Sequence, residues 1–155
     1  MICLYHGKSF LSRLIRFRTW SCYSHVSWLD DSTGEVYEAW IGGVRRAPNI
    51  NYGHKPGTLI SMFDVKLTQA QSKKLLQFFN EQVGRGYDYL GILGFAFRGE
   101  FQNQNKWFCS ELIAGGFKEI GKPLLERIPN WKVYPGMLAY SPLLKWAGAV
   151  KTCKN

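Results

Sequence analysis

An extended apolar segment that turns abruptly into a helix constrains the fold of this chain more than any other feature. The segment covers residues 106–113, Lys-Trp-Phe-Cys-Ser-Glu-Leu-Ile, and Cys109 stands at the junction. From Cys109 onward the apolar residues recur at the spacing of one helical face: Leu112, Ile113, Phe117 and Ile120. We therefore predict a helix that begins at Cys109, ends near Gly121 and packs one face against a core.

The position of Cys109 has two interpretations. A cysteine in the first turn of a helix lies among unpaired backbone N–H groups at the positive end of the helix dipole, and both favour the nucleophilic thiolate form. The alternative is that Cys109 is a small buried apolar residue on the same helical face, as most free cysteines are. Other parts of the chain have to decide between them.

Length and composition indicate one globular domain over residues 1–155, large enough to bury a core without cross-links. Hydrophobic residues make up 46% of the chain, which favours a folded protein over a disordered one. Apolar runs stay short of the roughly 20 residues that a transmembrane helix needs. The N-terminal residues lack the pattern of a signal peptide, so we expect a cytoplasmic or virion-associated protein.

The four cysteines are scattered without CxxC pairing: Cys3, Cys22, Cys109 and Cys153. We expect them to be reduced, because a domain of this size without an export signal does not need disulfides. Cys3 and His6 are close in sequence, but no second ligand pair follows at a convincing spacing. We predict no metal site and no organic cofactor.

The net charge of +9 permits attraction to nucleic acid, to an anionic membrane or to an anionic cell-wall polymer, and does not choose among them. The basic residues are dispersed and no nucleic-acid-binding motif accompanies them. We therefore expect no specific nucleic-acid binding.

A β-hairpin is predicted from residues 23–29 and 35–41, which are rich in aromatic and β-branched residues. Between them, Asp30 to Gly34 has the composition of a turn. If the turn centres on residues 32 and 33, Ser27 lies opposite Glu38, and His25 and Glu38 become diagonal neighbours on one face. A shift of one residue would put Tyr37 in place of Glu38.

Further elements follow from local patterns. We predict strands over residues 2–5 and 58–65, and a segment over 42–46 that leads into a loop containing Pro48 and Pro56. We also predict an aromatic stretch over 87–97, a polar loop over 99–106, and an edge segment over 143–150. Thr68 and Gln71 form a capping box. The helix that they open stops at Gly84, with its inward residues at Leu75, Leu76, Phe79 and Val83.

Residues 9–18 are also predicted to be helical, with apolar residues at helical spacing: Phe10, Leu11, Leu14 and Ile15. We favour a helix that packs one face on the core. A helix that lies on a membrane surface is the alternative.

Nucleophilic cysteine chemistry needs a thiolate, an imidazole to share its proton and a polar group to hold that imidazole. Cys109, His25 and Glu38 supply one of each. His25 could instead be a core histidine, and Glu38 a solvent-facing glutamate. His6, near a glycine, and His54, in a Pro- and Gly-containing loop, are weaker candidates.

Several short motifs resemble the permuted branch of the NlpC/P60 papain-like superfamily, and within it the YiiX/YaeF-like amidases and peptidases. The motifs are Ser24-His25-Val26, Glu38-Ala39, Gly43-Val44, Tyr87-Asp88 and Phe108-Cys109-Ser110-Glu111-Leu112. The similarity as a whole spans Ser9 to about Pro142. In this branch the histidine strand precedes the cysteine helix, as it does here. The resemblance implies an α+β fold, with a small antiparallel sheet or half-barrel packed against the cysteine helix.

The resemblance further implies that Cys109 is the nucleophile, His25 the base and then the acid, and Glu38 the third residue. We accordingly predict a cysteine hydrolase of amide or peptide bonds, cell-wall peptide included, that forms a thioester acyl-enzyme. The Cys109 N–H would donate to the oxyanion, with Tyr23 or Tyr87 as a second donor.

Three other functions stay open. They are a lipid acyltransferase or thioesterase of the lecithin:retinol acyltransferase-like type, which peripheral membrane contact would suit, a non-catalytic binding module that retains the fold, and, least favoured, a nucleic-acid binder. The sequence does not predict the oligomeric state.

Overall fold

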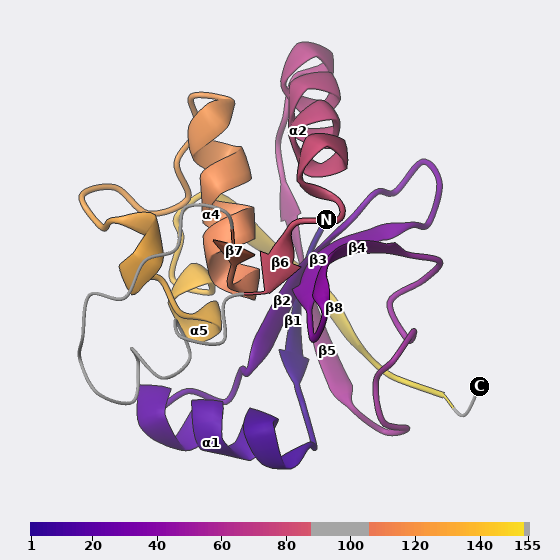
Figure 1. Cartoon of the computed structure of the whole chain (residues 1–155). Coiled ribbons are helices and arrows are strands. Elements are labelled where there is room, and N and C mark those ends of the chain that lie inside the picture. Colours follow the sequence, from indigo (N-terminus) through magenta and orange to yellow (C-terminus); the bar gives the residue numbers. More distant parts are fainter. Residues whose placement is uncertain (88–105, 154–155) are drawn as a thin grey trace.

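The computed structural model describes residues 1–87 and 106–153, and its centre is one antiparallel sheet (Figure 1). Six strands lie in the order β4-β3-β2-β1-β5-β8. Their bounds are Ile2–His6 (β1), His25–Leu29 (β2), Val36–Trp40 (β3), Gly43–Ala47 (β4), Leu59–Val65 (β5) and Leu144–Lys151 (β8). A separate parallel pair is formed by Gly86–Tyr87 (β6) and Lys106–Trp107 (β7).

Strand β1 lies inside the sheet and is buried on both faces. Ile2 and Leu4 belong to the main core, whereas Cys3 and Tyr5 belong to a second, smaller cluster with Ile60 of β5. Because side chains alternate along a strand, β1 contributes to both layers. This explains why its sequence is continuously apolar.

The β2–β3 hairpin has the predicted register. Trp28 pairs with Tyr37 and Leu29 with Val36, and the same register places Ser27 opposite Glu38. The turn between the strands is held by Asp30, which accepts hydrogen bonds from the backbone and side chain of Ser32. The register follows from a short turn with one stable geometry.

The sequence analysis did not predict a strand after Gly42. Residues Gly43–Ala47 form β4, which returns along β3 and places Arg45 directly opposite Glu38. Gly42 and Gly43 have φ values of +104° and +138°, a region that side-chain-bearing residues avoid. These two glycines let the chain reverse tightly, so the basic residues after them run along the sheet.

Three helices pack around the main core: Gln69–Gln82 (α2), Cys109–Glu119 (α4) and Pro135–Leu138 (α5). A short 3₁₀ segment, Asn130–Lys132, precedes α5. The capping box of Thr68 and Gln71 is confirmed at the start of α2. Val83 was predicted to face inward, but α2 ends one residue before it and its side chain is 45% exposed.

Helix α1 (Phe10–Thr19) lies at one end of the sheet, at the bottom of Figure 1. Ser9 caps it by accepting a hydrogen bond from the Ser12 N–H. Only Ile15 of this helix is buried, and Leu11 packs partly against the core. The expectation that Phe10 and Leu14 share this packing was wrong, because both side chains are exposed.

The remaining predictions concern the edge of the sheet and the middle of the chain. The predicted edge segment forms β8, which pairs with β5. Most of the predicted aromatic stretch lies outside the described residues, as does the predicted polar loop apart from Lys106, which begins β7. Within residues 1–87 and 106–153, no helix has the length and apolar character to cross a membrane.

Candidate functional site

The side chains of His25 and Glu38 form the centre of the candidate site. Both are buried, and Nε2 of His25 lies 2.6 Å from Oε2 of Glu38, with the ring nitrogen donating to the carboxylate. This contact is the diagonal pairing that the hairpin register predicts. Since Nε2 is engaged with Glu38, Nδ1 is the ring nitrogen left for another partner.

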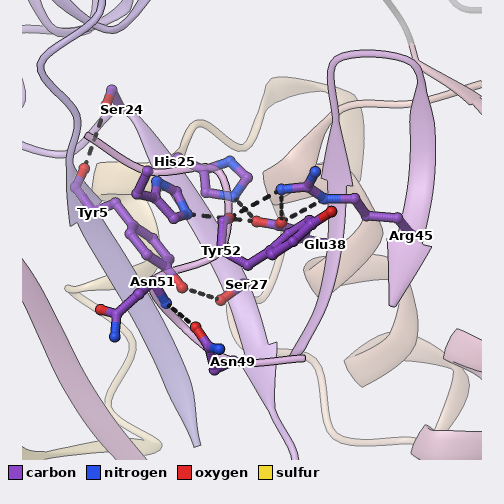
Figure 2. Close-up of polar contacts among 10 residues, drawn as sticks. Tyr5, Ser24, His25, Ser27, Glu38, Arg45, Asn49, Asn51 and Tyr52 are labelled. Carbon is purple, nitrogen blue, oxygen red and sulfur yellow. Dashed lines mark hydrogen bonds and ion pairs between the residues drawn. The ribbon is translucent and has the colours of Figure 1, made fainter. Parts of the chain in front are cut away.

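Glu38 is held from its other side by Arg45, so that His25 and Arg45 approach the carboxylate from opposite directions (Figure 2). Nε and Nη2 of Arg45 donate to Oε1 of Glu38 at 2.8 and 2.6 Å. Burial raises the pKa of Glu38, but the hydrogen bonds from the histidines and the charge of Arg45 lower it well below its usual range. Glu38 is therefore a buried carboxylate that stays ionised at neutral pH.

Arg45 is itself fixed by aromatic contacts. Its guanidinium lies 4.6 Å from the ring centre of Trp40 and 5.0 Å from that of Tyr52. Nη2 also donates to the Tyr52 carbonyl oxygen. These contacts hold the positive charge in one place, which keeps the orientation of Glu38 defined.

The Cys109 side chain lies within hydrogen-bonding reach of His25. Burial lowers the pKa of His25, but the charge and hydrogen bond of Cys109, followed by those of Glu38, raise it to about 9. The contacts with Cys109 and Glu38 therefore favour the imidazolium form of His25. The three side chains predicted to form a triad are thus together in space.

The ends of two elements explain how Cys109 and His25 meet. Trp28 and Ala39 of the hairpin face the core that contains α4, so alternation directs His25 and Glu38 to the opposite face. His25 is the first residue of β2 and Cys109 is the first residue of α4. The contact forms at these ends, where neither the sheet nor the helix separates the side chains.

The start of α4 is held firmly. Glu111 accepts a hydrogen bond from the Phe108 N–H, which is half of a capping box. The hydroxyl of Ser110 donates to the Val133 carbonyl oxygen. The Cys109 N–H lies in the first turn, where a backbone N–H lacks the carbonyl partner that later helical residues have.

His54 is a further member of the site that the sequence reasoning ranked too low. Its Nε2 lies 3.8 Å from Oε2 of Glu38, and its ring stacks on Tyr5 at 4.1 Å between centres. Burial lowers the pKa of His54, which outweighs the hydrogen bond to Glu38. His54 is therefore neutral beside a charged His25.

A pocket of about 350 Å³ opens beside His25. It lies between α1 and the loop that carries His54, and its lining includes Leu11, Ile15, Trp40 and Tyr87. Cys109 is 1% exposed and is not among the described residues that line this pocket. The pocket thus reaches the histidine, while the thiol lies behind it.

The two predicted oxyanion donors have different surroundings. Tyr87 lines the pocket and its ring centre lies 6.2 Å from that of Phe108, next to Cys109. The Tyr23 hydroxyl donates to the Ser61 hydroxyl on β5. Tyr23 is thus engaged with the sheet, and Tyr87 is the better placed of the two.

Arg45 is the site residue that sequence reasoning missed, and His54 is the one that it ranked too low. Arg45 could have been found by extending the alternation of β3 through the Gly42–Gly43 reversal, which pairs it with Glu38. His54 carries no comparable signal, because a loop and not a strand register brings it to the site.

His25, Glu38 and His54 also have the composition of a metal-ligand set, with ligand atoms within 4.8 Å of one another. Two ligands on one zinc ion, at about 2.0–2.2 Å each, stand roughly 3.3 Å apart in a tetrahedral site. The 2.6 Å contact between His25 and Glu38 is shorter and is that of a shared proton. Arg45 adds a positive charge at the same carboxylate, so this arrangement fits a proton better than a metal ion.

Comparison with known proteins identifies the fold. No protein-family model matches the chain, and no curated protein sequence matches it either. The crystal structure of metalloprotein YiiX from Escherichia coli O157:H7 matches with a TM-score of 0.70 and 19% sequence identity, over 99% of this chain and 96% of that one. The chain therefore has a YiiX-like α+β fold.

Proposed function

We propose that this protein is a permuted papain-like cysteine hydrolase in which Cys109, His25 and Glu38 form the catalytic triad. The observation that carries the proposal is the buried His25 ring, which donates to Glu38 through Nε2 while it interacts with Cys109. Such a ring can move a proton between the sulfur and a leaving group. Glu38, fixed by Arg45, holds its orientation.

The first step forms an acyl-enzyme. The Cys109 thiolate attacks the substrate carbonyl carbon, and the electron pair of the C=O bond moves to the oxygen. When the intermediate collapses, the bond to the leaving nitrogen or oxygen breaks and the imidazolium of His25 gives its proton to that atom. The thioester remains on Cys109, and the Cys109 N–H and Tyr87 are the proposed oxyanion donors.

The second step releases the acyl group. Neutral His25 takes a proton from water, the hydroxide attacks the thioester, and the carboxylic acid product leaves as the thiolate reforms beside imidazolium. An amide or peptide is the favoured substrate, because it needs the leaving-group proton that His25 holds. Esters would react through the same steps.

The structural neighbour is described as a metalloprotein, which raises a metal as a second possibility for the same cluster. The short His25–Glu38 contact and the charge of Arg45 oppose it. We therefore expect chelation with EDTA to leave the reactivity of Cys109 unchanged, and added zinc to slow it by competing for His25. Reactivity that chelation removes and zinc restores would contradict this.

Alkylation by iodoacetamide, followed for each cysteine by peptide mass spectrometry, tests the triad. Cys22 is exposed and Cys109 is buried, so accessibility alone predicts faster labelling of Cys22. A thiolate at Cys109 reverses that order near pH 6, where an ordinary thiol is almost fully protonated. We expect His25→Ala to slow labelling of Cys109 roughly tenfold or more, with Cys22 unchanged.

Equal labelling of Cys109 in both proteins would refute the catalytic proposal and favour a binding module. The substrate class is separated by comparing hydrolysis of peptidoglycan peptides with hydrolysis of lipid esters. Cys109→Ala is the blank in each assay.

A further inference from the structure

The pocket beside His25 touches one member of the proposed triad and not another. Its volume is about 350 Å³, and His25 is among the residues that line it. Cys109 is 1% exposed and is not among the described lining residues. A molecule in this pocket therefore contacts the imidazole and not the sulfur.

The two halves of a substrate have different partners in acyl transfer. The carbonyl carbon bonds to the sulfur of Cys109, whereas the leaving nitrogen takes its proton from His25. The leaving atom must come within hydrogen-bonding reach of the imidazole, roughly 2.6–3.2 Å. The part of the substrate that extends from the leaving atom therefore begins at His25, where the pocket opens.

Aromatic contacts fix the imidazole in the wall of the pocket. The ring centres of Trp40 and His54 lie 5.0 and 5.6 Å from that of His25, and both residues also line the pocket. Tyr87 lines it too, and contacts Phe108, the residue before Cys109. The pocket thus keeps a defined position relative to the proton donor.

The chemistry of the wall indicates what the pocket accepts. Aliphatic side chains come from α1, through Leu11 and Ile15, and from Ile41, just after β3. Each CH₂ group that such a wall removes from water improves affinity roughly fourfold. Lys8 and Lys55 also line the pocket, but the Lys8 ammonium donates to a backbone carbonyl oxygen.

We propose that this pocket binds the leaving-group side of the substrate and selects an apolar group there. In a peptide, that group is the side chain of the first residue after the scissile bond. The inference rests on the hydrolase function proposed above and specifies one side of its substrate.

The acyl-enzyme can be used to test the pocket, with p-nitrophenyl acetate as the acyl donor. Nitrophenolate leaves without needing a proton, so acetylation of Cys109 does not depend on how the pocket is filled. An added amino acid amide then competes with water. Its nitrogen attacks the thioester carbonyl, His25 takes a proton from that nitrogen, and the thiolate leaves, so the incoming amine occupies the leaving-group site.

We expect leucinamide to capture the acetyl group roughly tenfold or more better than glycinamide at equal concentration, measured as the N-acetyl products. Ile41→Ser should reduce this preference roughly threefold or more. The matched control is Val150→Ser, which removes an aliphatic side chain that is 41% exposed and does not line the pocket, and should keep the preference. Thermal melting checks that both variants are folded.

Equal capture of leucinamide and glycinamide on an acetylated Cys109 would overturn the pocket assignment and leave the hydrolase function standing. Better capture of glutamic acid α-amide than of leucinamide would overturn the apolar selection, and an unchanged preference in Ile41→Ser would place the selectivity outside the pocket. A Cys109 that carries no acetyl group, by peptide mass spectrometry, would refute the hydrolase function and this inference with it.

Discussion

Helices α1 and α4 have similar lengths and similar apolar spacing, but they are buried to very different extents. Every residue of α4 from Cys109 to Phe117 is buried, whereas α1 buries only Ile15. Their ends differ as well: α4 is followed by Gly121 at φ +69°, and α1 by Trp20 at φ +50°. Apolar periodicity therefore predicts that a helix forms, but not whether protein covers it.

Replacing a leucine by alanine in each helix should show the largest difference between them, in the free energy of unfolding. Leu112 of α4 is fully buried, so Leu112→Ala leaves a cavity and should lower the free energy of unfolding by about 2–5 kcal/mol. Leu14→Ala in α1 should change it by less than about 0.5 kcal/mol. Urea denaturation of both variants measures the difference, and equal losses would mean that α1 is covered in solution.

The pH dependence of stability should come from His25, which contacts the start of α4, and not from His6, which lies near α1. The folded-state pKa of His25 is raised to about 9 from an ordinary 6.5, so its contribution is complete below pH 6.5 and is lost as the pH rises to 9. His6, whose pKa is lowered by burial and then by Arg16 of α1, contributes no loss in this range. Denaturation at several pH values should show the loss in the unmodified protein and in His6→Gln, but not in His25→Gln.

The smallest expected effect is a gain at the end of α1. Trp20→Gly removes an exposed ring and relieves the left-handed backbone, so it should raise the free energy of unfolding by about 0.5–1 kcal/mol. A loss of stability instead would show that Trp20 serves the fold of α1.

Local patterns predicted the hairpin and the face shared by His25 and Glu38, because a short turn and strand alternation leave only one register that is consistent with burial. They also predicted the α4 helix from its own spacing. The meeting of Cys109 and His25 was a hypothesis, since it depends on how a helix from the last third of the chain docks on a sheet from the first third.

Other features of the fold and the site were not predicted from the sequence, for physical reasons. The Gly42–Gly43 reversal looks like the start of a loop, which concealed β4 and the pairing of Arg45 with Glu38. His54 reaches the site through a loop whose path is set by packing around Tyr5. Phe10 and Phe17 are exposed because no described element packs against them. The spacing of apolar residues within a helix does not predict which other elements will cover it.

The pairing of β5 with β8 has a consequence for how the protein folds. Val65 pairs with Leu144, and the segment between them contains α2 and α4. Strand β8 can therefore join the sheet only after this segment has folded back to the β5 edge. Contacts between distant residues carry a loop-closure entropy before they give any stabilisation. We expect folding in roughly milliseconds to seconds, with the hairpin that carries His25 and Glu38 formed early and the thiol of Cys109 delivered to it late.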